Sequence, residues 1–127
     1  MEQVLYTFGP FGTCVCDGPY GVFKWQRTNT VRVELTDRVV RGRKQRSFFV
    51  FNPPHSSGKT LFAVPYAGLL LVRRSPLPAR LGLMDVLELT YGAGDRQKVL
   101  SIAGYKDHVD KALGVLRRFV PAERIQA

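Results

Sequence analysis

The strongest constraint on the fold lies near the end of the chain, where the spacing of apolar residues changes from two to three and four. Over residues 86–91, apolar and polar side chains alternate, which is typical of a half-buried strand. Glycines and an aspartate over 92–95 indicate a turn, and a second alternating run follows at 98–102. The sequence therefore predicts an antiparallel hairpin with a connecting loop of about three to five residues.

The residues after this hairpin predict one amphipathic helix over 107–119. Its apolar positions are spaced by three and four and form a single stripe: Val109, Ala112, Leu113, Leu116, Phe119 and Val120. Asp107 is placed as the N-cap, and Asp110 stands three residues later in the position of a capping-box acid. Arg117 and Arg118 fall in the last turn, where the helix dipole favours cations, and Pro121 ends the helix. We expect the apolar stripe to be buried and to close the core.

The rest of the chain has the patterns of short strands and turns. Strand-like segments occur at 2–8, at 31–36 continuing through 39–40, at 48–51, at 61–66 and at 69–73. Pro65 lies inside one of them, which favours an edge strand or a bulge. With the terminal hairpin, the tally is about seven strands and then one helix, so the predicted fold class is mainly β (α+β) with antiparallel sheets. The chain has 127 residues and no internal repeat, so we expect a single domain over 1–127.

A dense run of cations separates the strand at 31–40 from the segment at 48–51. Its members are Arg38, Arg41, Arg43, Lys44 and Arg46. Gly42 provides a permissive backbone, so the run is predicted to form the turn of a hairpin. The whole chain carries 19 Lys and Arg against 10 Asp and Glu, a formal net charge of +9, which suits an anionic partner.

Few residues suggest metal or catalytic chemistry. Cys14 and Cys16 would lie on one face of a strand, and buried structural thiols are favoured over a zinc site, a disulfide or a catalytic Cys-His pair with His108. The triplet at 58–60, Gly-Lys-Thr, lacks the upstream glycine and the following helix of a phosphate-binding P-loop. The acids stand singly on alternating strands, with no predicted carboxylate pair. The sequence therefore predicts no cofactor, no metal and no enzyme.

The expected location is cytoplasmic, with peripheral membrane association if the basic run binds lipid. The longest apolar run, at 67–72, is far shorter than the ~20 residues of a transmembrane helix. The start of the chain also lacks a basic segment followed by an apolar stretch, which would indicate a signal peptide.

The order of elements, with VRVELTDRVVRGR early and VLELTYGAGDRQKVLSIAGYKDHVDKALGVLRRFV at the end, resembles the pleckstrin-homology (PH) superfold. The likeness is greatest to its bacterial PH-like and GRAM-like relatives and covers about residues 31–120, whereas residues 1–30 are less typical. The resemblance implies a bent barrel or sandwich of about seven antiparallel strands closed by the terminal helix. It also implies a non-catalytic binding or assembly module.

In PH domains that bind phosphoinositides, Lys and Arg of the first hairpin hold the headgroup. The resemblance therefore implies that Arg41, Arg43, Lys44 and Arg46 occupy the matching places, and guanidinium groups can form bidentate hydrogen bonds with phosphate. The partner would be an anionic lipid headgroup or a protein. The alternative is that the run is ordinary solvated surface.

Two further hypotheses stay open. Aromatic residues on strands beside a basic loop could stack nucleic-acid bases: Phe23, Trp25, Phe48, Phe49 and Phe51. This would make the chain a nucleic-acid-binding β domain, although no RNP-like signature is present. Unblocked edge strands could instead pair between copies, which predicts a homo-oligomer.

Overall fold

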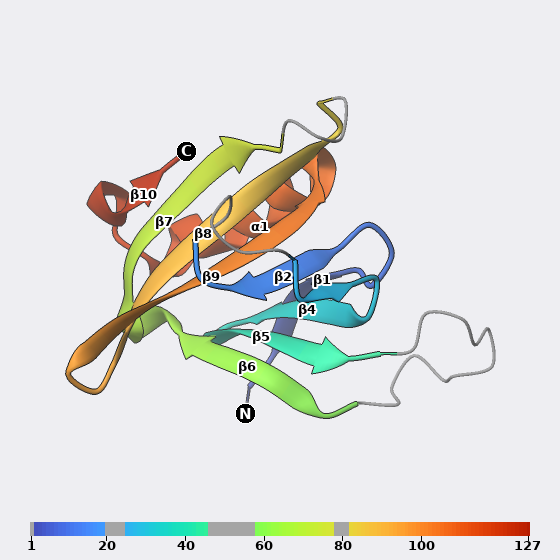
Figure 1. Ribbon diagram of the computed structural model, residues 1–127. Coiled ribbons are helices and arrows are strands. Elements are labelled where there is room, and N and C mark those ends of the chain that lie inside the picture. Colours follow the sequence, from blue (N-terminus) through green and yellow to red (C-terminus); the bar gives the residue numbers. More distant parts are fainter. Residues whose placement is uncertain (1, 20–24, 46–57, 78–81) are drawn as a thin grey trace.

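The computed structural model describes residues 2–19, 25–45, 58–77 and 82–127, and it contains two β-sheets and one long helix (Figure 1). A four-stranded sheet has the order β1-β4-β5-β6, with bounds Val4–Phe8, Val31–Thr36, Val39–Lys44 and Thr60–Pro65. A six-stranded sheet has the order β10-β7-β8-β9-β2-β3, with bounds Ile125–Gln126, Leu69–Pro76, Met84–Ala93, Arg96–Tyr105, Cys14–Asp17 and Arg27–Thr28. The mainly β, α+β fold class is therefore confirmed.

The sheets differ from the prediction in two respects. Among the described residues the two sheets remain separate and do not close into a barrel, so the barrel alternative of the expected barrel or sandwich is wrong. The pairing is also not wholly antiparallel, because the short β10 runs parallel to β7. The first 30 residues contribute to both sheets, since β1 pairs with β4 while β2 pairs with β9 and β3.

The terminal hairpin is confirmed, and its strands are longer than predicted. β8 and β9 pair from Met84↔Tyr105 to Ala93↔Arg96, so Gly92 and Ala93 belong to the strand and only two residues connect the pair. Gly94 lies in this connection with φ +67°, a conformation that glycine adopts at no steric cost. The expected loop of three to five residues is therefore wrong.

The helix α1 spans Lys106–Phe119, and its buried residues follow the predicted stripe: Val109, Ala112, Leu113 and Leu116. Phe119 is only partly buried and stacks on Tyr66 with ring centroids 5.1 Å apart. The capping prediction is wrong, because Tyr105 is the N-cap, no side chain caps the helix and Asp107 lies in the first turn. Asp110 instead pairs with Arg74 at 2.6 Å, so tertiary contacts hold this end of the helix.

The helix packs against β1, β8 and β9 and completes a core that receives side chains from both sheets. A smaller cluster joins Cys14, Leu77, Met84, Val86 and Ala103 beside the partly buried Trp25. The two apolar groups use opposite faces of β8, as the alternation in its sequence predicts. None of the described helices has the length and apolar composition needed to cross a bilayer.

Candidate functional site

The basic run lies on a hairpin that turns earlier than predicted. β4 ends at Thr36 and β5 begins at Val39, so only Asp37 and Arg38 form the connection. Thr36 Oγ1 accepts hydrogen bonds from the backbone N–H groups of Arg38 and Val39, both at 3.0 Å. Such side-chain bonds to the backbone two and three residues on are characteristic of threonine at a turn.

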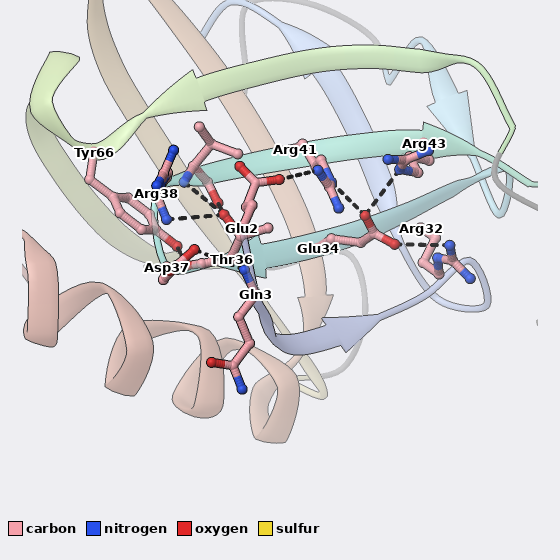
Figure 2. Close-up of polar contacts among 11 residues, drawn as sticks. Glu2, Gln3, Arg32, Glu34, Thr36, Asp37, Arg38, Arg41, Arg43 and Tyr66 are labelled. Atoms are coloured by element: carbon pink, nitrogen blue, oxygen red, sulfur yellow. Dashed lines mark hydrogen bonds and ion pairs between the residues drawn. The ribbon is translucent and has the colours of Figure 1, made fainter. Parts of the chain in front are cut away.

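Distant parts of the chain hold this turn in place (Figure 2). The Tyr66 hydroxyl donates to the Thr36 carbonyl at 2.6 Å, and the Tyr66 N–H donates to the Arg38 carbonyl at 3.0 Å. Asp37 Oδ1 accepts from the Gln3 N–H at 3.0 Å, and the Asp37 N–H donates back to the Gln3 carbonyl at 2.9 Å. Burial raises the pKa of Tyr66 strongly, helped by the nearby carboxylates, so this hydroxyl stays a donor at neutral pH.

This register changes the environment of the predicted site residues. Arg38 is exposed in the turn, Arg41 and Arg43 are strand residues of β5, and Lys44 is exposed at the strand's end. The prediction that Arg41 and Arg43 belong to a flexible turn is therefore wrong, while Arg46 and the segment 48–51 lie outside the described residues.

Gly42 has a packing role in place of the predicted turn role. It is a buried residue of β5, opposite Phe62 of β6. A Cβ atom at Gly42 would clash with the Phe62 ring. The glycine is therefore explained by the close approach of this ring to the strand.

The arginines of the hairpin converge on one buried carboxylate, Glu34 of β4 (Figure 2). Arg41 Nε lies 2.6 Å and Arg43 Nε 3.1 Å from Glu34 Oε1, while Arg32 Nη2 lies 2.9 Å from Oε2. Arg41 Nη1 also pairs with Glu2 of the N-terminal segment. We call these five residues the arginine face: Glu2, Arg32, Glu34, Arg41 and Arg43.

Strand register explains why these side chains meet. Glu34 stands opposite Arg41, and Arg32 stands opposite Arg43, so all four side chains leave the sheet on the same side. The alternate residues of β4 and β5 point into the core, among them Val33, Leu35 and Val40. The arginine face is therefore the outer surface of the four-stranded sheet.

The ion pairs shift the pKa values of their members in opposite directions. Burial would raise the pKa of Glu34, but the hydrogen bond from Arg41 and the charges of the three arginines lower it below its ordinary value. Burial would lower the pKa of Arg41, and the pairing with Glu34 and Glu2 raises it above its ordinary value. Glu34 is therefore ionised at neutral pH and is unsuited to act as a general acid there.

The face keeps a positive balance that can attract an anion. Three guanidinium groups meet two carboxylates, which leaves one positive charge in excess on the face. Arg38 in the turn and Lys44 at the end of β5 are also exposed, but Lys44 stands opposite the core residue Val31 and therefore leaves the sheet on the other side. Each of the three arginines makes one charge-assisted contact to Glu34, so this carboxylate holds the three guanidinium groups close together. Sequence reasoning identified the cations on β5 but missed Arg32 and Glu34, although the alternation at 31–36 places both on one face.

The other candidate groups do not assemble with one another. His108 Nδ1 lies 2.6 Å from the Tyr6 hydroxyl oxygen, and its ring stacks on Phe8 at 5.5 Å between centroids. Cys16 Sγ donates to the Gly18 carbonyl at 3.7 Å. Among the described residues, no three His, Cys, Asp or Glu side chains gather as metal ligands.

Both cysteines are buried and free, as predicted, and we expect them to be chemically inert in the folded protein. Burial raises the pKa of the Cys16 thiol, which disfavours the reactive thiolate, and reagents cannot reach a buried sulfur. Dithiobis(nitrobenzoate) should therefore react with about two thiols per chain in urea, releasing one thionitrobenzoate for each, and should react with the native protein only as fast as the protein unfolds. Rapid labelling of one thiol under native conditions would contradict the structural role.

No protein-family model matches this chain, and no curated protein matches it significantly.

Proposed function

We propose that this protein is a non-catalytic, PH-like binding module whose arginine face docks on an anionic membrane surface. The observation that carries the proposal is the convergence of three arginines on one outer sheet face. Glu34 holds their guanidinium groups together on that face. The formal net charge of +9 adds long-range attraction to anionic lipid.

The order of elements supports the PH-like part of the proposal. β1 joins the consecutive strands β4, β5 and β6 in one sheet, and the consecutive strands β7, β8 and β9 precede α1. Within residues 31–120, which the resemblance covers, these are the six strands β4 to β9 followed by α1, and β1 from the less typical N-terminal part adds a seventh. The open sheets and the additional β2, β3 and β10 depart from that pattern.

Vesicle binding tests the proposal. The variant Arg32→Ser/Arg43→Ser removes two guanidinium groups of the arginine face and leaves Arg41 paired with Glu34. Each cation near an anionic surface contributes about 1 kcal/mol, so this variant should bind phosphatidylserine-containing vesicles roughly 30-fold more weakly. The natural protein should sediment with these vesicles and not with neutral phosphatidylcholine, and less so at high salt because the Debye length falls from about 10 Å at 0.1 M to about 3 Å at 1 M.

The matched control is Arg96→Ser/Lys98→Ser, which removes two exposed cations from the β8–β9 hairpin. It should bind nearly as well as the natural protein. Equal losses in both variants would mean that net charge alone attracts the protein, and the arginine face would be rejected. Stronger binding to a single-stranded oligonucleotide that persists at high salt would favour nucleic acid, because base stacking is less sensitive to salt than phosphate contacts.

A further inference from the structure

Strand β6 is the edge of the four-stranded sheet within the described part of the chain. It pairs with β5 on one side, and its sheet order ends there. The Tyr66 N–H points toward β5, because it donates to the Arg38 carbonyl at 3.0 Å. Backbone groups alternate along a strand, and Val64 stands directly opposite Val40, so the N–H and C=O of Ala63 point away from β5.

A cleft of about 550 Å³ runs along this edge. Its first wall is formed by four consecutive residues of β6: Leu61, Phe62, Ala63 and Val64. Successive side chains of a strand point to opposite faces, so four consecutive residues line one cleft only if it follows the edge of the backbone. The opposite wall comes from β8, β9 and the end of β2, with lining residues Asp17, Gly18, Tyr91, Lys98 and Val99.

We propose that this cleft binds an extended peptide segment of a partner protein, which adds as a fifth strand to β6. The N–H and C=O of Ala63 would bond to the peptide backbone, as edge strands do when they accept an added strand. Peptide side chains on the inner face would contact half-buried Phe62, Tyr91 and Val99. The added strand would lie about 4.8 Å from β6, between the two walls.

The positively charged residues beside the cleft favour peptides in which apolar and acidic residues alternate. Within the described part of the chain, the exposed cations beside the cleft are Lys59, just before β6, and Lys98 on the opposite wall, and they outnumber the one carboxylate among its lining residues, Asp17. On the outer face of the sheet, Ala63 stands opposite Arg41, which already pairs with Glu34 and Glu2. Outward peptide side chains would therefore lie on the side of the sheet that carries the arginine face. A second copy of this chain fits less well than a peptide, because the wall containing Tyr91 and Lys98 stands where the second copy's sheet would continue.

The test uses three synthetic peptides of equal length: alternating valine and glutamate, the same residues with the alternation broken, and alternating valine and lysine. The first should bind at least tenfold more tightly than the other two. It should also slow hydrogen exchange of the Ala63 amide, which we expect to exchange rapidly in the free protein because its N–H points away from β5. Absence of binding by all three peptides, or equal binding, would overturn the proposal. So would an Ala63 amide that is already protected in the free protein.

The variant Ala63→Pro removes the outward N–H that the peptide needs and leaves the pairing with β5 intact, since proline is tolerated where the N–H of an edge strand faces outward. It should bind the valine–glutamate peptide at least tenfold more weakly, while the control Ala63→Ser keeps the backbone donor and should bind normally. Unchanged binding by Ala63→Pro would contradict strand addition. Light scattering that shows self-association lost in Ala63→Pro, without peptide binding, would assign the edge to a second copy instead. Vesicle binding should be unchanged in both variants, so this inference stands apart from the proposed membrane function.

Discussion

Replacing Leu116 by alanine should lower the free energy of unfolding by about 2 to 5 kcal/mol, the range for removing a large buried aliphatic side chain. Leu116 is 1% exposed and belongs to the core cluster that joins α1 to both sheets. Its loss leaves a cavity between helix and sheets that rigid neighbours fill only partly. Urea denaturation followed by circular dichroism measures the change directly.

The control for this variant is Arg117→Ala, one residue further along the same helix. Arg117 is exposed, so its replacement should change stability by no more than about 0.5 kcal/mol. If Leu116→Ala cost as little as Arg117→Ala, the helix would not close the core. Under conditions in which they are folded, both variants should bind vesicles as the natural protein does.

Replacing Glu34 by glutamine should cost about 2 to 3 kcal/mol at neutral pH. Breaking a fully buried ion pair typically costs 3 to 5 kcal/mol, and the arginines here retain 17 to 22% exposure of their side chains, so water compensates part of the loss. Without the carboxylate, three guanidinium groups remain close together and repel one another. The double variant Glu34→Gln/Arg41→Gln should lose less than the sum of the single variants, because the pair acts as a unit.

The same substitution predicts a pH dependence with a definite sign. The pKa of Glu34 in the folded protein is lowered, so its stabilising contribution is fully present above the ordinary glutamate value of about 4.3 and is lost as pH falls through the folded value. The difference in unfolding free energy between natural protein and Glu34→Gln should therefore be constant from pH 6 to 7 and shrink below about pH 4. A difference that stays constant at acid pH would mean that Glu34 is not held by the arginines.

Local patterns were sufficient to predict the two longest elements. The change of period after residue 102 correctly predicted a hairpin followed by one helix, because alternation and three-to-four spacing are properties of neighbouring residues. The buried stripe at Val109, Leu113 and Leu116 follows from the same pattern. The ends of these elements were less accurate, since Asp107 is a good cap by residue type but Tyr105 occupies the cap position.

What the local pattern missed depends on contacts between distant residues. The turn at Asp37 and Arg38 is held by Tyr66, about 30 residues further on, and by Gln3 at the start of the chain. Gly42 was assigned to a turn because glycine favours turns, whereas the close approach of Phe62 from another strand explains it. Because the turn lies at Asp37 and Arg38, the residues predicted to form a flexible loop after it belong to strand β5.

The candidate site, too, was predicted in part by local sequence and decided in part by contacts between distant residues. The sequence by itself determined that the cations cluster, that Arg32 and Glu34 share a face, and that the net charge is positive. Only the tertiary structure decided that Glu34 lies among three arginines, because that depends on the register between β4 and β5 and on burial of the carboxylate. The position of β6 at the edge of the described four-stranded sheet was likewise decided by how the two sheets meet, since Pro65 indicates an edge strand but not the cleft beside it. The spacing of residues along the chain determines whether a segment forms a strand or a helix and which of its side chains share a face. Which other segment packs against that face depends on contacts between residues far apart in the sequence.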